Sequence, residues 1–493
     1  MVNVIVSVWG DPSRWKPVKG YRVELPDGCG FYTAPKPYKS SLGPLMEAFS
    51  GAEVLLFASS TLGDPSVGSY SGLVSAVEGI VWSFLRGGEY CSDPSRIRAV
   101  VLPGIGRFER DVVKSFLGWL GQFRVAAFLK ALDFMDEFKP SRVILDLTHG
   151  INYMPAYTRL SVFDAITCYS ALNRVEVRLL VYNSEPFPDG AKEASDLNII
   201  LVEDFRFEPK WALTTLYDLL ASSLITWLKP APIRSVFGLR LPTYPEAEWR
   251  RLYKCMGKLV RAASWGLIIP LAEAVEELTS LDLQSLKREL ERFSYLRGCD
   301  DLVEIDGRTL RYLFSPVYEA ALLLGLGEVV KSFGFRVQRV DGGLGEGDLK
   351  RLAEALLPKT PLELFKHEWS QLQDRVKLFR VLGLDVGGWR RLKAYTEVGN
   401  VRFRGRSLLE FMREVEKEGG GLDSGALMKE LGSEVNKALA EGEKVEDPER
   451  RNFIAHAGLE RNVTLVSARG DSIYVKYDEN LRDRVDGIIK KLT

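Results

Sequence analysis

Cysteine and histidine are scarce in this sequence, and neither charge is in excess. Its 493 residues include five cysteines and three histidines, and the cysteines lie far apart, so their spacing predicts neither a disulfide framework nor a zinc site. The 66 lysines and arginines equal the 66 aspartates and glutamates. This balance excludes an overall positive field that attracts nucleic acid, so any such contact must come from a local patch.

Long hydrophobic runs are also absent. No segment approaches the ~18 consecutive apolar residues of a transmembrane helix, and the opening residues, MVNVIVSVWGD, predict a strand and not a cleaved signal peptide. We therefore expect a cytoplasmic protein with no membrane contact. A content of 46% hydrophobic and 27% charged residues is typical of a soluble globular protein, and the length predicts two or three domains.

Strand and helix patterns alternate in the N-terminal part of the chain. Apolar runs predict buried strands at 2–9, 54–58, 99–102, 143–147 and 175–182, and a hairpin is expected at 21–25 and 30–33. Helical patterns lie between the strands at 44–49, 69–85, 112–138 and 153–170. The alternation predicts an α/β fold with a mostly parallel, doubly wound sheet. Helical patterns dominate from Pro209 onward, which predicts an all-α C-terminal part.

The loops that follow the predicted strands carry groups suited to holding phosphate. Ligands of doubly wound sheets bind at the carboxyl ends of the strands, and these loops offer backbone N–H groups, hydroxyls and amides there. The candidate ligand-binding residues are Trp9, Gly10, Asp11, Pro12, Ser59, Ser60, Thr61, Gly104, Thr148, His149, Gly150, Asn152 and Asn183. The alternative is that such loops are rich in Gly and Ser for turn chemistry, and that His149 only caps a helix or hydrogen-bonds a backbone group.

The segment 447–458 reads as a complete short helix. Asp447 is a good N-cap, and Gly458 can take the left-handed conformation that ends a helix. The segment contains Arg-Asn-x-x-x-His, formed by Arg451, Asn452 and His456. Arg451 and His456 lie about 140° apart around the helix axis, so a second copy across a two-fold axis is expected to close a cleft lined by both residue types. The alternative is a solvated charge and a histidine at a helix end.

Other C-terminal features are less specific. The glycine-rich segment 341–347 lacks the Lys-Ser/Thr of a phosphate loop and is interpreted as a flexible linker, while 463–467 and 472–477 predict a closing hairpin. His367 is interpreted as a surface histidine. A row of basic residues either follows an RNA backbone or forms a solvated helix face; it consists of Arg250, Lys254, Lys258 and Arg261.

Motifs at the two ends of the chain resemble two known domain families. Asp146–Met154 resembles the D-x-T-x-G-x-x-x-M segment of CARF domains, the Rossmann-like sensors of cyclic oligoadenylates in CRISPR systems, and Trp9–Pro12 is similar to the CRISPR-associated Csx branch. The Arg451 to His456 pattern resembles the R-x4-H signature of HEPN ribonucleases. We therefore expect a CARF domain at 1–205, a helical linker domain at 206–310 and a HEPN domain at 311–493.

The resemblance implies a CRISPR-associated, single-strand-specific endoribonuclease of type III systems. It implies activation by a cyclic oligoadenylate, with cyclic tetra-adenylate as the expected ring, bound to a CARF homodimer or higher homo-oligomer. Cleavage would proceed by attack of the RNA 2′-hydroxyl with neither metal nor cofactor. We hypothesise that His456 acts as acid/base or orients the 2′-hydroxyl, that Arg451 stabilises the phosphate charge, and that Asn452 positions His456 or the phosphate.

Two alternatives remain open from the sequence. The chain could be a non-catalytic ligand-sensing protein whose HEPN helix binds RNA or a partner, in which case His456→Ala would leave its activity intact. It could instead be a ring nuclease in which Thr148 or His149 cuts the cyclic ligand itself.

Overall fold

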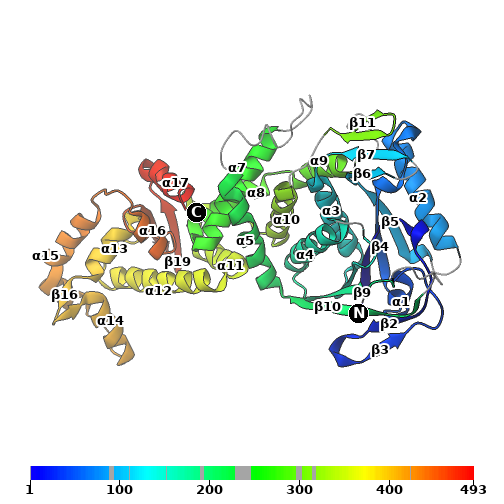
Figure 1. Ribbon diagram of the computed structural model, residues 1–493. Helices are drawn as coiled ribbons and strands as arrows, with labels where there is room; N and C mark the ends of the chain where they lie inside the picture. Colours follow the sequence, from blue (N-terminus) through cyan, green and yellow to red (C-terminus); the bar gives the residue numbers. More distant parts are fainter. Residues whose placement is uncertain are drawn as a thin grey trace. The chain divides into compact units, whose positions relative to one another are not determined.

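The chain folds into two units, each built from segments that are distant in the sequence (Figure 1). The computed structural model describes residues 2–87, 94–109, 112–150, 153–188, 194–227, 246–295, 303–313, 318–421 and 423–492. The first unit comprises Met1–Pro245 and Asp282–Val329, and the second comprises Glu246–Leu281 and Val330–Thr493. The segment 206–310, expected as a linker domain, is therefore divided between the two units.

An eight-stranded mixed sheet is the centre of the first unit, with the order β3-β2-β10-β9-β8-β1-β4-β5. Five adjacent strands of this sheet pair in parallel, as the α/β prediction requires: β9, β8, β1, β4 and β5. Strands β2 and β3 form the predicted antiparallel hairpin. The strands are β1 (Asn3–Trp9), β2 (Val18–Glu24), β3 (Phe31–Thr33), β4 (Glu53–Ser59), β5 (Ile97–Leu102), β8 (Arg142–Asp146), β9 (Val177–Ser184) and β10 (Ala194–Phe207).

Helices cover both faces of this sheet, which explains why its central strands are continuous apolar runs. Helices α1 (Leu42–Ala48) and α2 (Tyr70–Arg86) pack on the face that contains Ile5 and Leu56, whereas α3 (Leu120–Phe138) and α4 (Tyr153–Asn173) pack against each other on the opposite face (Figure 1). Three further helices belong wholly or partly to this unit: α5 (Pro209–Trp227), α9 (Leu283–Tyr295) and α10 (Tyr318–Ser332).

A second, four-stranded sheet in this unit was not expected. It has the order β11-β12-β7-β6 and joins β6 (Gly106–Glu109) and β7 (Val113–Leu117) to β11 (Val303–Asp306) and β12 (Thr309–Tyr312). The helix predicted at 112–138 was wrong at its start, because Val113–Leu117 pairs with the distant β12 and the helix begins only at Leu120.

The second unit is mainly helical, as expected for the C-terminal part, but it also contains a five-stranded antiparallel sheet, with the order β13-β14-β19-β18-β15, that the all-α prediction did not include. Its helices are α7 (Glu246–Trp265), α8 (Ile268–Thr279), α11 (Glu346–Leu356), α12 (Lys359–Val381), α13 (Leu392–Gly399), α14 (Leu408–Lys417), α15 (Ser424–Gly442), α16 (Arg450–Ala455) and α17 (Arg482–Lys490). Its strands are β13 (Arg339–Val340), β14 (Gly343–Gly345), β15 (Arg390–Arg391), β18 (Thr464–Arg469) and β19 (Ser472–Tyr477), and β16 (Arg402–Phe403) pairs with β17 (Arg406–Ser407).

The predicted closing hairpin is confirmed by β18 and β19, but the predicted linker at 341–347 was wrong. Asp341 and Gly342 both have positive φ, +47° and +78°, which is the two-residue turn favoured in hairpins. The turn joins β13 to β14, and Leu344 enters the core with no exposed surface. The glycine-rich segment therefore contains a strand, which the buried side chain of Leu344 anchors in the core.

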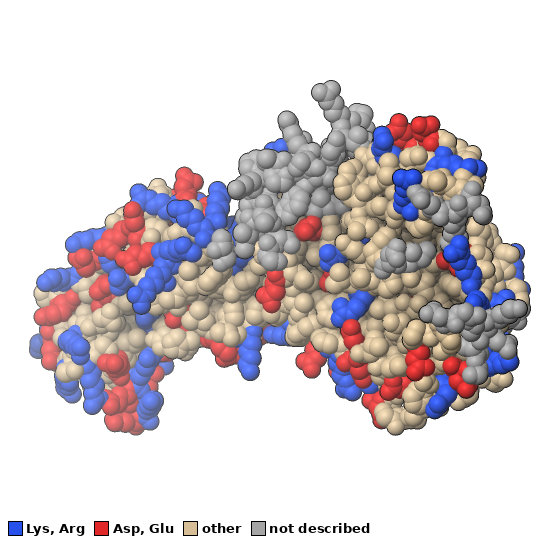
Figure 2. All heavy atoms as spheres, in the orientation of Figure 1, with Lys and Arg blue, Asp and Glu red and all other residues tan. Residues whose placement is uncertain are grey.

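The basic row on α7 does not form a single solvated face. Lys258 donates to Glu273 at 2.6 Å, and burial lowers the pKa of Arg261. In the residues described, no helix is long and apolar enough to cross a membrane. On the visible face of each unit, Lys and Arg alternate with Asp and Glu without a broad patch of one sign (Figure 2).

Candidate active site and ligand pocket

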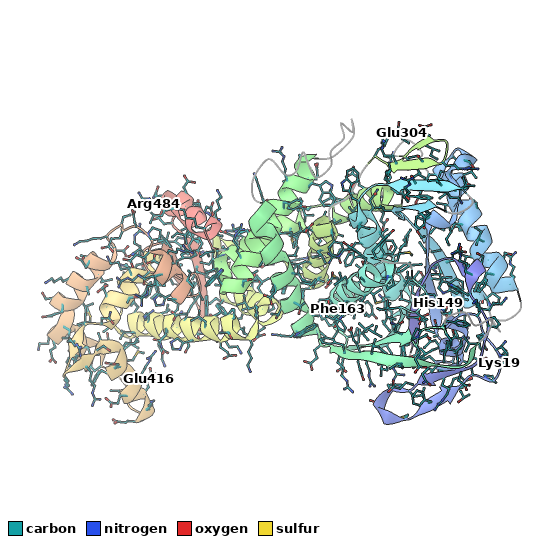
Figure 3. All side chains as sticks on the ribbon, viewed as in Figure 1. Lys19, His149, Phe163, Glu304, Glu416 and Arg484 are labelled. Carbon is teal, nitrogen blue, oxygen red and sulfur yellow. The ribbon has the colours of Figure 1, made fainter. Side chains whose placement is uncertain are left out.

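A cavity of about 290 Å³ lies at the carboxyl ends of the first unit's strands. Thr148 and His149, both predicted site residues, line it, and His149 is labelled in Figure 3. Arg14, Lys16 and Lys39 bring positive charge to the wall. The remaining lining residues are Trp15, Tyr21, Ser184, Glu185, Pro186, Phe187 and Leu197. The cavity therefore combines cations with aromatic surface, which suits a ligand with phosphates and bases.

His149 is held as a neutral ring. Its Nε2 accepts a hydrogen bond from the backbone N–H of Ser41 at 3.1 Å, and Trp15 stacks on the ring with centroids 4.2 Å apart. Burial lowers the pKa of His149 to about 4, against an opposing effect of Asp146. Because Nε2 is an acceptor in the neutral ring, the proton lies on Nδ1. His149 thus hydrogen-bonds a backbone group, as one interpretation of the sequence held, and it also lines the cavity.

The rest of the Asp-x-Thr-His-Gly motif also secures the loops around the cavity. The buried Asp146 carboxylate accepts from the hydroxyls of Ser7 and Ser41, each at 2.8 Å, and from the N–H of Thr148 at 3.1 Å. The Thr148 hydroxyl accepts from the Ser184 N–H at 3.2 Å. A Cβ added at Gly150 would lie 2.4 Å from the ring of Pro155, so only glycine fits there.

The loop after β1 contacts the His149 loop directly. The N–H of Gly10 donates to the carbonyl of His149 at 2.7 Å, and Asp11 caps the following turn by accepting from Ser13. Pro12 is buried in this turn. Trp9 is fully buried and packs edge-on against Trp15, so it contributes to the core behind the cavity and not to its wall.

The loops after β4 and β5 do not reach the cavity. The hydroxyl of Ser60 is buried between the Tyr312 hydroxyl at 2.7 Å and the N–H of Gly104 at 2.8 Å, and Ser59 is hydrogen-bonded to Thr61. Tyr312 belongs to β12, so the unexpected second sheet supplies the partner that buries Ser60. Asn183 is exposed at the end of β9, and Asn152 lies outside the described residues.

Sequence reasoning missed much of the cavity wall. Arg14, Trp15 and Lys16 directly follow the Gly-Asp-Pro turn, and this cation–aromatic–cation run was a signal that could have been used. The Lys16 Nζ lies 5.4 Å from the ring centre of Phe187, a distance typical of cation–π contact. Lys39 reaches the cavity from a loop that carried no recognisable motif.

In the second unit, the predicted catalytic residues lie on α16 and at its C-cap, and the helix is shorter than expected. The N-cap is Glu449 and not Asp447: the helix begins at Arg450, and Asp447 forms an ion pair with Arg484. The helix also ends earlier than predicted: its C-cap is His456, Ala457 takes the left-handed conformation with a φ of +51°, and Gly458 follows with a φ of +76°. Phe453 anchors the helix in the core, and the Tyr477 hydroxyl donates to the carbonyl of Gly458 at 2.9 Å.

The three predicted catalytic side chains have different surroundings. Arg451 is exposed and forms no ion pair with any residue the structure describes. The side-chain amide of Asn452 donates to the Glu449 carboxylate at 2.8 Å and does not contact the His456 ring. His456 follows the last helical residue, its side chain is 46% exposed, and its backbone N–H donates to the carbonyl of Asn452.

Two residues of α12 were missed at this site. Glu368 Oε2 lies 3.0 Å from His456 Nδ1, although 88 positions separate the two residues in the sequence. Arg375, two helical turns further along α12, is half-buried and has no ion pair or hydrogen bond with the described residues. Burial lowers the pKa of Arg375, whereas Glu368 acts to raise it, so the two side chains are electrostatic neighbours.

Two family models match the chain, one in each motif region. Residues 4–186 match the CARF domain of CRISPR system endoribonuclease Csx1, and residues 363–479 match the HEPN domain of the same protein. This chain belongs to the CRISPR-associated CARF–HEPN family. The CARF match contains Thr148 and His149, and the HEPN match contains Glu368, Arg375 and the whole of α16.

A curated CARF–HEPN relative supports the same assignment. The chain is 29% identical over 217 residues to the CRISPR system endoribonuclease Csx1 of Methanocaldococcus jannaschii. The aligned part covers 43% of this chain and 42% of the relative, so the likeness spans less than half of either protein.

Proposed function

We propose that this CARF–HEPN protein is an endoribonuclease that cleaves single-stranded RNA when a cyclic oligoadenylate occupies its CARF domain. The observation that carries the proposal is the state of the two histidines in the motifs. His149 is enclosed and neutral beside a cavity, whereas His456 is exposed with its Nε2 free of any described partner. The first arrangement suits ligand binding, and the second suits proton transfer.

The HEPN chemistry follows from these side chains. The Nε2 of His456 takes the proton of the RNA 2′-hydroxyl, the 2′-oxygen bonds to the adjacent phosphorus, and the bond from phosphorus to the 5′-oxygen breaks. The departing 5′-oxygen takes a proton from a protonated histidine ring or from water. The products are a 2′,3′-cyclic phosphate and a 5′-hydroxyl. Arg451 stabilises the charge that develops on the phosphate oxygens.

A homodimer is part of the proposal because one copy of α16 cannot direct both residues to one phosphate. Arg451 and His456 project in directions about 140° apart on an ideal helix. The exposed side chain of Arg451 has no described ion-pair partner and is available to a cleft formed with a second copy. Each cleft would then use both residue types.

The activator site is proposed at the cavity beside His149. Arg14, Lys16 and Lys39 would bind phosphates, and Trp15 and Phe187 would contact bases. The cavity measures about 290 Å³, near the lower end of the range of about 300–1,000 Å³ for small-molecule sites. One protomer would therefore hold only part of a cyclic tetra-adenylate, and a second copy would hold the rest.

The ring-nuclease alternative is less well supported by this geometry. A general base needs a free lone pair, and the Nε2 lone pair of His149 is used by the Ser41 N–H. Thr148 remains a candidate nucleophile, although its oxygen accepts a hydrogen bond from Ser184. Incubating the protein with labelled cyclic tetra-adenylate and searching for linear products tests this activity directly.

RNA cleavage with and without cyclic tetra-adenylate tests the main proposal. We expect the activator to increase cleavage of a single-stranded substrate and the products to carry 2′,3′-cyclic phosphate or 3′-phosphate ends. Cleavage should continue in EDTA, because the described residues contain no group of three or more His, Cys, Asp or Glu side chains that could hold a metal ion. Loss of cleavage in EDTA that magnesium restores would contradict this mechanism.

A further inference from the structure

Helix α12 brings one carboxylate to His456. Its apolar residues recur at helical spacing and are buried, which fixes the helix in the second unit; they are Leu362, Phe365, Trp369, Leu372 and Val376. Glu368 lies beside this buried stripe, with 14% of its side chain exposed. The carboxylate is therefore held in place by a packed helix, while the ring it contacts is half open to solvent.

The contact selects one form of the histidine ring. An ionised carboxylate can only accept hydrogen bonds, so a bond at 3.0 Å to Nδ1 requires that Nδ1 carry the proton. The lone pair of the neutral ring is then on Nε2, the nitrogen that faces away from Glu368. In the other tautomer, the Nδ1 lone pair would face the carboxylate oxygens and the bond would be lost.

We propose that Glu368 is the positioning residue of the HEPN centre, holding His456 as the Nδ1–H tautomer with Nε2 directed to the RNA 2′-hydroxyl. The inference rests on the proposed ribonuclease activity and identifies the residue that makes His456 a base. Glu368 touches no substrate atom in this scheme. It acts through the orientation and tautomer of the ring, as carboxylates behind catalytic histidines do in other enzymes.

A purely stabilising role does not account for the arrangement. The pair is partly exposed, and ion pairs at such sites contribute little to folding stability. The ring has no other side-chain partner among the described residues, so without Glu368 its χ angles and its tautomer would be free to vary. The expected consequence of losing Glu368 is a slower chemical step with an unchanged fold.

The test compares Glu368→Ala and Glu368→Asp with the matched control Glu363→Ala in the full-length, activated protein. Glu363 is exposed on the same helix and pairs with Lys366, so its loss removes an equal charge away from His456. We expect Glu368→Ala to lower kcat by about 10- to 100-fold with KM within about twofold of wild type, as is typical for residues that orient a catalytic group. Glu368→Asp should recover part of kcat, and Glu363→Ala should match wild type.

Nuclear magnetic resonance of the histidine rings gives a readout independent of activity. The chain has only three histidines, so labelling histidine with ¹⁵N yields few signals, and His456→Ala assigns the one of interest. At a pH where the ring is neutral, wild type should show the Nδ1–H pattern for His456. Glu368→Ala should shift it toward the Nε2–H pattern, which predominates for histidine in water.

The outcomes separate this inference from the proposed function. A wild-type protein that cleaves no RNA would refute the proposed ribonuclease activity, and the tautomer of His456 could still be measured. An active Glu368→Ala with wild-type kcat, a rise in KM alone, or an unchanged Nδ1–H signal would each overturn the role of Glu368. If Glu368→Ala lowers the melting temperature substantially, Glu368→Leu repeats the test with a larger side chain that cannot accept a hydrogen bond from Nδ1–H, and a wild-type kcat together with an unchanged tautomer would again overturn the proposal.

Discussion

Trp15 stacks on His149 with their ring centroids 4.2 Å apart and their planes inclined by 29°. The stack places the histidine between an aromatic wall and the backbone of Ser41, where it cannot accept a proton without losing its hydrogen bond. The His149 ring is therefore a fixed part of the cavity, and the proposed mechanism assigns proton transfer to His456.

Replacing His456 should abolish cleavage without unfolding the protein. The side chain is 46% exposed, so His456→Ala leaves no buried cavity. We expect a loss of at least ~100-fold in the rate of activated RNA cleavage, the usual contribution of an acid/base group. His367→Ala is the control, because His367 is exposed on α12 and makes no contact in the proposed mechanism. A folded His456→Ala protein with wild-type activity would remove this residue from the mechanism.

Replacing Thr148 and His149 together should weaken activator binding and leave the HEPN centre unchanged. Both residues line the cavity and secure its loops, so the double alanine variant should need more cyclic tetra-adenylate for half-maximal cleavage and should keep its unstimulated cleavage. Ser60→Ala provides the contrast. Ser60 lies buried against Tyr312 and away from the cavity, so its loss should lower stability by about 1 kcal/mol with no change in activator affinity. Titration with labelled activator measures both variants, and equal affinity for wild type and the double variant would refute the assigned pocket.

Acid should destabilise the fold through His149. Its pKa is about 4 in the folded chain and 6.5 in a model peptide, so the folded state disfavours the charged ring. The neutral ring makes its full contribution to the free energy of unfolding above pH 6.5. This contribution is lost as the pH falls toward 4 and amounts to about 3 kcal/mol, at ~1.4 kcal/mol per pKa unit. Melting temperatures of wild type and His149→Gln, measured between pH 7.5 and 4.5, test this. The pH dependence of wild type should be the steeper of the two, and parallel curves would show that His149 is not the titrating group.

Arg375 should affect RNA binding more than chemistry. It is half-buried next to Glu368 and has no described acceptor, as expected for a guanidinium that binds a phosphate of the substrate. We expect Arg375→Ala to raise the KM for RNA several-fold, with a smaller effect on kcat. Lys377→Ala is the matched control, since Lys377 is exposed on the same helix and pairs with Glu416. Equal KM values for the two variants would exclude a phosphate contact at Arg375.

Much of the first unit could be predicted from local sequence patterns. The buried strands β1, β4, β5, β8 and β9 follow apolar runs, and the helices between them follow helical periodicity. Local patterns failed where a segment's structure depends on a distant strand. Val113–Leu117 pairs with Thr309–Tyr312, and no sequence pattern near either segment predicts this pairing. The Asp341-Gly342 turn was a usable local signal, but its partner strand β19 lies more than a hundred residues away.

The sequence alone determined the motifs and part of their local conformation: the Asp-x-Thr-His-Gly loop, the Arg-Asn-x-x-x-His helix and the left-handed Gly458 that follows this helix. These depend on residues within a few positions of one another. The tertiary structure decided which residues complete each site. It buries Ser60 beneath Tyr312, brings Lys39 to the cavity, and places Glu368 against His456. The contacts of Ser60 and of Glu368 join residues 252 and 88 positions apart, and they arise from the packing of whole helices and sheets, whose distances and angles no short sequence pattern encodes.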